Sequence, residues 1–170
     1  MILYHFYADD SQLFRISSLN ESDQKEARDH LEKSIHVIAD WMHKNKLKLN
    51  PTKTEFIVLR SKRNTSKVAE SVLNLEDGVI ECSGSVRNLG VTMDIHLDMQ
   101  AHVSNIRRLC YHYIGWIKQI RPFLAENDAK MIVHALVIFR LGYCNSVYHG
   151  LPNHMIHSLQ LVMNDAARVK

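Results

Sequence analysis

The chain has 170 residues, of which 46% are hydrophobic and 23% are charged. This length fits one domain, or a small domain with a helical appendage, and the composition lies in the globular range, so disorder is not the default expectation. The net charge is +3 and the pI is about 8.8, which allows a nucleic-acid partner but excludes the extreme charge of a histone-like protein.

The N-terminal segment predicts a β-hairpin. Residues 2–7 are rich in aromatic and branched side chains, and residues 8–11 (ADDS) have the chemistry of a turn. Residues 12–17 then resume an apolar pattern. We therefore expect two antiparallel strands that meet at the acidic turn.

An amphipathic helix is expected after the hairpin. Residues 20–23 (NESD) offer N-capping side chains and early negative charge. One apolar face follows, at spacings of four, three and four residues, made by Leu31, Ile35, Ile38 and Met42. Pro51 helps to end this helix.

Short strands are expected through the middle of the chain. Residues 55–60 (EFIVLR) have the apolar run of a buried strand, and residues 60–67 (RSKRNTSK) have the polar, basic character of a loop. The dipeptide Asp77-Gly78 is a hairpin signal. The remaining strand candidates are residues 71–75, 79–82 and 85–93.

After residue 98 the periodicity becomes helical. A first helix ends at Pro122 and has one apolar stripe, made by Val103, Ile106, Leu109, Tyr113, Ile117 and Ile120. A second helix is expected over residues 126–141 and a third over 153–169. The third would have Ile156, Leu159, Met163 and Ala166 on one side. We interpret Trp116, Phe123 and Phe139 as core residues of these helices.

The change of pattern near residue 95 predicts an α+β chain with two parts. Residues 1–95 combine strands and a helix, and residues 96–170 are all-helical.

The cysteines and the apolar runs bear on the compartment. Cys82, Cys110 and Cys144 are widely spaced, so neither a disulfide framework nor a zinc site is indicated. No apolar run approaches the roughly 18 residues of a membrane span, and charge comes too early for a signal peptide. We therefore expect an intracellular protein, cytoplasmic or nuclear, with no membrane partner.

Asp9 and Asp10 stand side by side at the predicted turn. Two ionised carboxylates this close repel each other, and a divalent cation removes the repulsion. Mg²⁺ takes one or two carboxylates and completes its shell with water and phosphate oxygens. Two such ions can clamp the attacking and leaving oxygens of a phosphoryl transfer. The alternative is that the pair only makes a favourable turn.

Several short motifs follow one another along the chain. The first ones are residues 4–13 (YHFYADDSQL), 41–42 (WM), 45–55 (NKLKLNPTKTE) and 86–91 (VRNLGV). Later ones are residues 120–124 (IRPFL), 140–145 (RLGYCN), 150–152 (GLP), 159–160 (LQ) and 164–168 (NDAAR). In this order they resemble the downstream half of a non-LTR (LINE-type) retrotransposon reverse transcriptase.

The resemblance implies a partial polymerase palm over residues 1–95, made of the antiparallel hairpin, a helix and short strands. An all-helical thumb would follow over residues 96–170. The catalytic hairpin would carry Asp9 as a ligand of two metal ions and Asp10 as an auxiliary ligand. The implied cofactor is Mg²⁺, with Mn²⁺ as a substitute. The implied partners are an RNA template, a DNA primer and a dNTP.

The resemblance also assigns roles outside the hairpin. Lys53 would lie near the incoming triphosphate, where a cation stabilises the leaving pyrophosphate. The alternative for Lys53 is a solvated lysine after a helix. Leu89, Gly90 and Val91 would form the primer grip that presses on the primer strand, although a simple turn glycine is an equal interpretation of Gly90.

Basic residues of the first thumb helix, among them Arg107 and Arg108, would contact phosphates of the template–primer duplex. The alternative is solvated charge, which is the usual state of exposed cations.

A palm-type site needs a third carboxylate, which family members carry on a strand before the hairpin. The fingers also precede the hairpin in the family. Neither is among these 170 residues, so we expect a reverse transcriptase fragment that is inactive by itself. The alternatives are a noncatalytic nucleic-acid-binding module and a decayed retroelement remnant.

Overall fold

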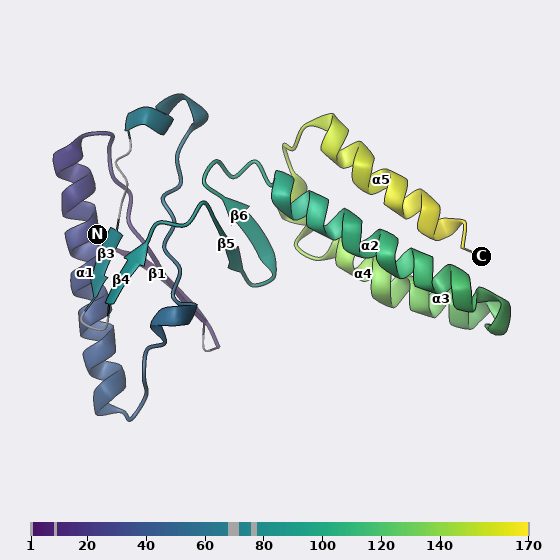
Figure 1. Ribbon diagram of the computed structural model, residues 1–170, viewed down its shortest axis with the longest axis horizontal. Coiled ribbons are helices and arrows are strands. Elements are labelled where there is room, and N and C mark those ends of the chain that lie inside the picture. Colours follow the sequence, from purple (N-terminus) through teal and green to yellow (C-terminus); the bar gives the residue numbers. More distant parts are fainter. Residues whose placement is uncertain (1, 9, 68–71, 76–77, 170) are drawn as a thin grey trace. The chain divides into compact units, whose positions relative to one another are not determined.

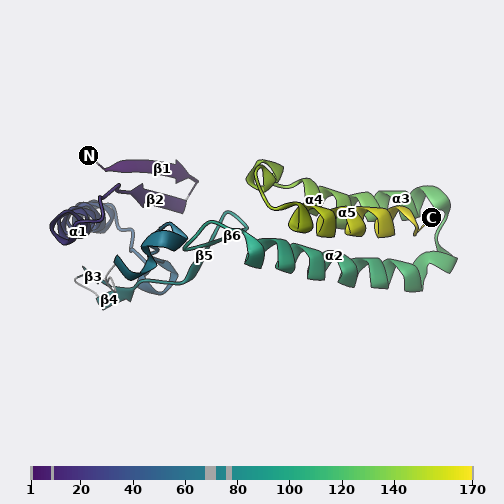
Figure 2. The same ribbon diagram turned by 90° about the horizontal axis from the view of Figure 1, so that it is seen from above.

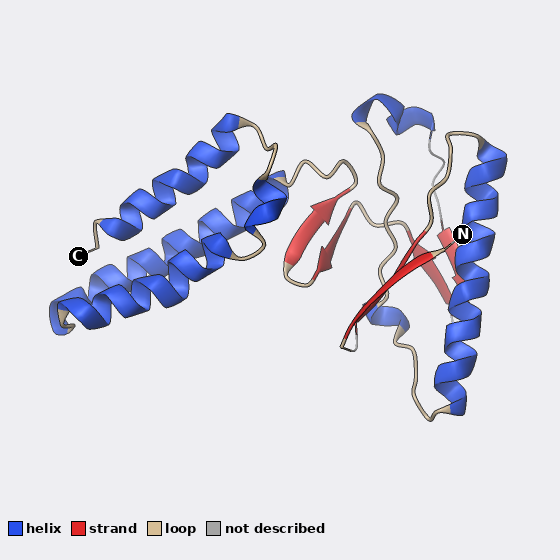
Figure 3. Cartoon of the chain, turned by 180° about the vertical axis from the view of Figure 1, so that it is seen from behind, coloured by secondary structure: helices blue, strands red, loops and turns tan. Residues whose placement is uncertain are grey.

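The computed structural model describes residues 2–8, 10–67, 72–75 and 78–169. It has the mixed α+β composition expected from the sequence, with small antiparallel hairpins and helices (Figure 1, Figure 3). The chain divides into two compact units, Met1–Val86 and Arg87–Lys170. The division falls within one strand, β5 (Ser85–Asn88).

The first unit begins with the predicted hairpin. β1 (Leu3–Tyr7) pairs antiparallel with β2 (Asp10–Phe14), in a register that places Leu3 opposite Phe14. Tyr4 and Phe6 lie on the same face of β1, with ring centroids 5.4 Å apart. All five residues of β1 are exposed, so this ribbon buries little apolar surface of its own.

The predicted helix is α1 (Glu21–Lys44). Asn20 is the N-cap residue as expected, but its side chain makes no capping bond. Instead the carboxylate of Asp23 accepts a hydrogen bond from the backbone N–H of Ser18. This bond favours the ionised carboxylate and lowers the pKa of Asp23.

The C-terminus of α1 is closed by a Schellman motif. Lys46 adopts a left-handed conformation with φ of 61°. The backbone N–H of Leu47 donates to the carbonyl of Met42 at 2.8 Å, and that of Lys46 donates to the carbonyl of His43 at 3.0 Å. The helix therefore ends before Pro51. Lysine does not favour the left-handed conformation that the motif imposes on Lys46.

A second hairpin packs on α1. β3 (Val72–Leu75) and β4 (Gly78–Glu81) pair antiparallel with Leu75 opposite Gly78. Asp77 of the hairpin signal lies outside the described residues. The Glu32 carboxylate accepts a hydrogen bond from the backbone N–H of Asn74 at 2.6 Å, which fixes β3 against the helix.

The strand expected at residues 55–60 is wrong. Only Phe56 makes a β-bridge, to Cys82, and its carbonyl accepts from the N–H of Ser83 at 2.8 Å. The segment runs between two short 3₁₀ turns, η1 (Pro51–Lys53) and η2 (Lys62–Lys67). An apolar run becomes a strand only where a partner strand supplies a ladder of hydrogen bonds. Here the partner supplies a single bridge, so no strand forms.

The single strand expected at residues 85–93 is also wrong, because the chain turns back in its middle. β5 pairs with β6 (Val91–Asp94), and Leu89 and Gly90 form the two-residue connection. Their φ angles are 45° and 83°. Positive φ at both positions is the requirement of a type I′ turn, which matches the twist of paired strands.

Asp94 organises the loop between β6 and α2 (Gln100–Ile120). Its carboxylate accepts hydrogen bonds from the backbone N–H groups of His96, Asp98 and Met99, at 3.0, 3.1 and 3.0 Å. One charged side chain therefore holds the entry to the longest helix of the second unit.

The helices of the second unit begin close to the predicted positions. α2 is followed by η3 (Arg121–Phe123), then by α3 (Glu126–Val133), the π-helical segment η4 (His134–Ile138) and α4 (Phe139–Gly142). After η5 (Asn145–Tyr148) comes α5 (Asn153–Ala167). Figure 2 shows α2 running beside the α3–η4–α4 helix and α5. No helix in the described ranges combines the length and apolar character that crossing a membrane requires.

The core of the second unit lies between these helices. It consists of Val103, Cys110, Ile114, Ile117, Val137, Leu141, Met155, Leu159, Val162, Ala166 and Val169. The predicted face of the third helix is partly wrong, because Ile156 and Met163 are each 41% exposed.

The interpretation of three aromatic residues as core is wrong. Trp116, Phe123 and Phe139 are 54%, 86% and 67% exposed. Trp116 instead packs on a neighbour of its own helix, His112, with ring centroids 4.2 Å apart. Large apolar side chains therefore remain on the surface of the second unit.

Candidate functional sites

One of the two predicted metal-binding residues, Asp10, lies at the tip of the β1–β2 ribbon. Tyr7 is paired with Asp10, so the ribbon ends at these two residues. Asp10 is the first residue of β2 and its side chain is exposed. Asp9 lies outside the described residues. The carboxylate of Asp10 is therefore held by a strand at the point where the ribbon meets solvent.

The backbone at this tip is strained. Ala8 follows β1 with φ of 51°, in the left-handed region. A side chain with a Cβ atom costs roughly 1–2 kcal/mol there, which is why glycine or asparagine is usual at such turns. Strain of this kind is common where a backbone conformation serves a site.

The described residues fit a magnesium site only in part. Mg²⁺ needs one or two carboxylates, with water and phosphate oxygens as further ligands. Asp10 supplies one such carboxylate. Across the described ranges, no group of three or more His, Cys, Asp or Glu side chains is arranged to hold a metal ion. Asp10 would therefore hold the ion together with ligands from outside this set.

Lys53 lies in a compact turn of the same unit. It is the last residue of η1, which is capped by Asn50, whose side-chain Oδ1 accepts from the N–H of Thr52 at 3.1 Å. The hydroxyl of Thr54 donates to the carbonyl of Asn50 at 2.9 Å. These bonds fix the backbone of Lys53 and leave its side chain exposed. Within the described residues, no hydrogen bond or ion pair joins Lys53 to Asp10.

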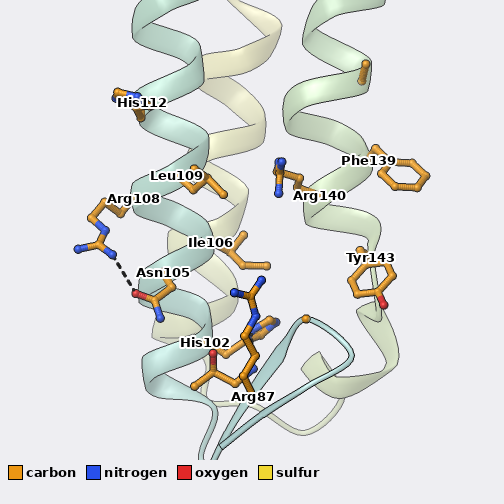
Figure 4. Close-up of a pocket in the computed structure, with 13 residues that line it drawn as sticks. Arg87, His102, Asn105, Ile106, Arg108, Leu109, His112, Phe139, Arg140 and Tyr143 are labelled. Atoms are coloured by element: carbon orange, nitrogen blue, oxygen red, sulfur yellow. Dashed lines mark hydrogen bonds between the residues drawn. The ribbon is translucent and has the colours of Figure 1, made fainter. Parts of the chain in front are cut away.

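A groove with a volume of about 850 Å³ lies in the second unit, between α2, α4 and the β5–β6 hairpin. We call it the arginine groove, because three arginines line it: Arg87, Arg108 and Arg140. Figure 4 shows Arg140 pointing from α4 towards α2, and Arg87 reaching from the hairpin into the same gap. Ile106 and Leu109 form an apolar floor on the α2 side.

Neutral groups hold two of these arginines. The guanidinium of Arg108 donates to Oδ1 of Asn105 at 3.4 Å. That of Arg140 lies over the ring of Tyr113, 5.2 Å from its centroid, and donates to its hydroxyl at 3.5 Å. These contacts orient the guanidinium groups without cancelling their charge. Arg107, predicted together with Arg108, is exposed on α2 but does not line the groove.

Of the predicted primer-grip residues, Gly90 lines this groove, and Leu89 contacts another of its lining residues. The carbonyl of Leu89 accepts a hydrogen bond from the hydroxyl of Tyr143 at 2.8 Å. A Cβ atom on Gly90 would lie 3.5 Å from Cε1 of the same tyrosine. Val91 is buried, at 7% exposure, Leu89 is half-buried and Gly90 is exposed.

His102 ties the hairpin to α2 from within. Its Nδ1 accepts a hydrogen bond from the backbone N–H of Thr92 at 3.3 Å. Its Nε2 and the hydroxyl of Tyr148 are buried and have no hydrogen-bond partner among the residues that the structure describes. The rings of His102 and Tyr148 stack with centroids 6.1 Å apart. Burial lowers the pKa of His102 and raises that of Tyr148, so both side chains are neutral.

The structure thus brings two predicted motifs together, through the contact between Tyr143 and Leu89. The sequence interpretation missed four residues of the groove: Arg87, His102, Phe139 and Arg140. Arg87 and Arg140 stand inside motifs that the sequence already singled out, so their position next to Leu89 and Tyr143 was the available signal. For His102 the sequence offers no such signal.

Comparison of the chain with protein-family models, with curated proteins and with solved structures gives no match.

Proposed function

We propose that the chain is the palm-and-thumb portion of an RNA-directed DNA polymerase, a reverse transcriptase of the non-LTR retrotransposon type. The observation that carries this proposal is the position of Asp10, an exposed carboxylate that opens β2 at the ribbon tip. Metal-dependent nucleotidyl transfer needs carboxylates that are held rigidly yet reach the substrate. A strand end at the tip of a ribbon gives the carboxylate a defined place in the strand register and exposes it to a substrate.

The other predicted residues have consistent roles in this proposal. Asp9 and Asp10 would hold Mg²⁺, which supplies charge neutralisation for the phosphoryl transfer. Lys53, exposed on a capped turn, would face the triphosphate. Gly90 is exposed and has no side chain, so the backbone of the turn would approach the primer closely at this residue. The helices that follow would hold the RNA–DNA hybrid.

The first test concerns catalysis by the 170-residue chain. The family's third carboxylate is not among these residues, so the metal cage is incomplete and primer extension is expected to be undetectable with Mg²⁺ or Mn²⁺. The measurement is dNTP incorporation on an RNA template with a DNA primer. Incorporation that is lost on Asp9→Ala would contradict this expectation while supporting the polymerase assignment.

The second test asks whether the ribbon tip binds a metal. Mn²⁺ is paramagnetic, so it broadens the amide signals of nearby residues in a nuclear magnetic resonance spectrum. We expect selective broadening at Tyr7, Asp10 and Ser11, reduced in Asp10→Asn. The matched control is Asp40→Asn, which removes an exposed carboxylate from α1.

The two variants separate a specific site from general charge. Loss of the broadening in Asp10→Asn but not in Asp40→Asn supports the metal site. Equal broadening in the wild type and both variants, or broadening spread over all exposed carboxylates, would sink the proposal. Both aspartates are exposed, so neither substitution is expected to change the fold.

A second candidate function is a noncatalytic nucleic-acid-binding module. The cluster of arginines in the second unit favours it, because such groups bind phosphates by releasing counterions. Binding of an RNA–DNA hybrid should then weaken steeply as salt is raised. Hybrid binding that does not change with salt would exclude both this function and the thumb assignment.

A further inference from the structure

The arginine groove is lined by positively charged side chains. Its lining residues include three arginines and no aspartate or glutamate. In the described part of the chain, Arg108 and Arg140 donate hydrogen bonds to the neutral groups of Asn105 and Tyr113, so their charge remains available to a ligand. A groove lined by one sign of charge attracts the opposite sign, so its ligand is an anion.

The size of the groove limits that anion. A volume of about 850 Å³ lies in the range of pockets that bind a small molecule. A double helix is far larger, since its major groove alone is about 12 Å wide. The space therefore accommodates a few nucleotides of one strand and excludes the body of a duplex.

An aromatic edge borders the arginines. Phe139 and Tyr143 are four residues apart and lie on the same side of the helix end in Figure 4. They are 67% and 44% exposed, although both are large rings that a bundle would normally bury. Exposed rings beside a cationic groove are the arrangement that binds single-stranded nucleic acid, because bases stack on the rings while arginines hold the phosphates.

The backbone around the groove is fixed in several ways. The π-helical turn η4 directly precedes Phe139 and Arg140. The hydroxyl of Tyr143 holds the Leu89 carbonyl, and Nδ1 of His102 holds the Thr92 amide. These contacts hold the hairpin on the helices, so the groove is formed before a ligand binds. Binding therefore costs little conformational entropy.

We propose that the arginine groove binds a short single-stranded segment of nucleic acid, with phosphates on Arg87, Arg108 and Arg140 and bases on Phe139 and Tyr143. This inference uses the same arginines as the second candidate function, and shares with the polymerase proposal only the class of partner. The polymerase proposal places a hybrid duplex against the thumb, whereas this groove takes unpaired nucleotides. It needs neither a metal ion nor catalysis.

The experiment measures binding of the 170-residue chain to a fluorescein-labelled oligodeoxythymidylate about six nucleotides long, by fluorescence anisotropy. The buffer contains a chelator, so that the metal site of the ribbon tip makes no contribution. Each phosphate neutralised on a single strand contributes about 0.7 to the slope of log Kd against log salt. Three arginines therefore predict a slope of about 2.

Two pairs of variants isolate the groove. Arg108→Gln and Arg107→Gln remove the same charge from adjacent positions of α2, but only Arg108 lines the groove. We expect Arg108→Gln to weaken binding roughly fivefold and to lower the salt slope by about 0.7, with little change for Arg107→Gln. Phe139→Ala should weaken binding roughly tenfold through lost stacking. Phe123→Ala, which removes an exposed ring elsewhere, is its control.

Three outcomes would overturn the proposal. Equal effects of Arg107→Gln and Arg108→Gln would show that only general charge attracts the strand. Competition by inorganic phosphate as strong as that by the oligonucleotide would show a simple anion site. Displacement of the oligonucleotide by a blunt hybrid duplex at equal concentration would show that the groove does not select unpaired nucleotides. None of these outcomes bears on the metal test of the ribbon tip, so the two proposals can fail separately.

Discussion

His102 is a buried histidine whose two ring nitrogens have different surroundings. Nδ1 accepts from Thr92, which requires that this nitrogen carry no proton, and Nε2 has no partner among the described residues. Protonation of Nδ1 would break the bond to Thr92 and place a charge beside Arg87 and Arg108, which line the same groove. The neutral form is therefore part of what holds the β5–β6 hairpin on α2.

This arrangement predicts a loss of stability at low pH. Burial lowers the pKa of folded His102 below the ordinary value of 6.5. The contribution of neutral His102 is complete above 6.5, because both states are then deprotonated. It declines as the pH falls towards the lowered pKa, because the unfolded chain takes up the proton first.

The measurement is the free energy of unfolding in urea between about pH 7.5 and about pH 5.5. The chain has 11 histidines, so the wild type is compared with His102→Asn, whose Oδ1 can accept from Thr92 without titrating. We expect the wild type to lose more stability than the variant over this range. Parallel pH curves for the two proteins would contradict the role assigned to His102.

Lys46 offers a second prediction at the scale of one residue. It closes the Schellman motif of α1 in a left-handed conformation that glycine adopts without strain. Lys46→Gly should stabilise the first unit by about 1 kcal/mol, since relief of strain exceeds the entropy that glycine loses on folding. The control Lys44→Gly removes the same charge from the last residue of α1 and should destabilise, by less than the roughly 1 kcal/mol of a helix interior.

Fluorescence of Trp41, in the same helix, can follow this change in a Trp116→Phe background. The two lysine variants should shift the urea midpoint in opposite directions. Shifts of the same sign would mean that loss of charge, not backbone conformation, decides the effect.

At the scale of elements, the two-residue turn between β5 and β6 makes its own prediction. Gly90→Ala should destabilise the second unit by roughly 1–2 kcal/mol, because φ of 83° is strained for any residue with a Cβ atom. The new Cβ would lie 3.5 Å from Tyr143, an ordinary contact, so the cost comes from the backbone. Thermal unfolding, followed by circular dichroism, measures the change.

Gly115→Ala provides the matched control for that variant. Gly115 lies within α2, and a Cβ atom there would meet nothing within 4 Å. The same chemical change should therefore stabilise the unit by about 1 kcal/mol, through helix propensity. A stabilised Gly90→Ala protein would show that the turn does not have the conformation described.

Element identity followed from sequence where a strong local pattern existed. The acidic hairpin and the amphipathic helices were predicted, because spacing of apolar residues reports directly on helix and strand geometry. Residues 55–60 failed because an apolar run does not reveal whether a partner strand is present. Residues 85–93 failed because the segment was predicted as one strand, although a turn was also an open interpretation of Gly90 and Leu89-Gly90 has the length of a hairpin turn.

The sequence predicted only those site residues that are close together along the chain. The carboxylate pair could be found because its members are adjacent in sequence. The arginine groove depends on Tyr143 reaching Leu89 across 54 positions, which no local pattern records. Phe139 and Trp116 were predicted to be core residues because their spacing fits a helix. Which face of a helix is buried depends on the elements that pack on it, and the spacing of residues does not identify these elements.

At the scale of the whole molecule, apolar burial is unevenly distributed. In the described part of the first unit the buried apolar residues are Ala27, Leu73 and Val86, whereas the helical core of the second unit is extensive. The β1–β2 ribbon is a separate two-stranded sheet, and such a sheet is marginally stable by itself. Its exposed aromatic residues, among them Tyr4 and Phe6, are surface that a further element can cover.

Uneven burial predicts that the two units unfold separately. Hydrophobic burial is the main source of stability, so the first unit should lose its structure at lower urea concentration than the second. The two tryptophans allow a direct test, since Trp41 lies in α1 and Trp116 in α2. In the single-tryptophan variants Trp116→Phe and Trp41→Phe, we expect the Trp41 transition to come first. Amide hydrogen exchange should show the same order, with fast exchange in β1 and β2 and protection in α2 and α5. Coincident transitions from both probes would show instead that the units form one cooperative structure, in which the ribbon gains its stability from the helical unit.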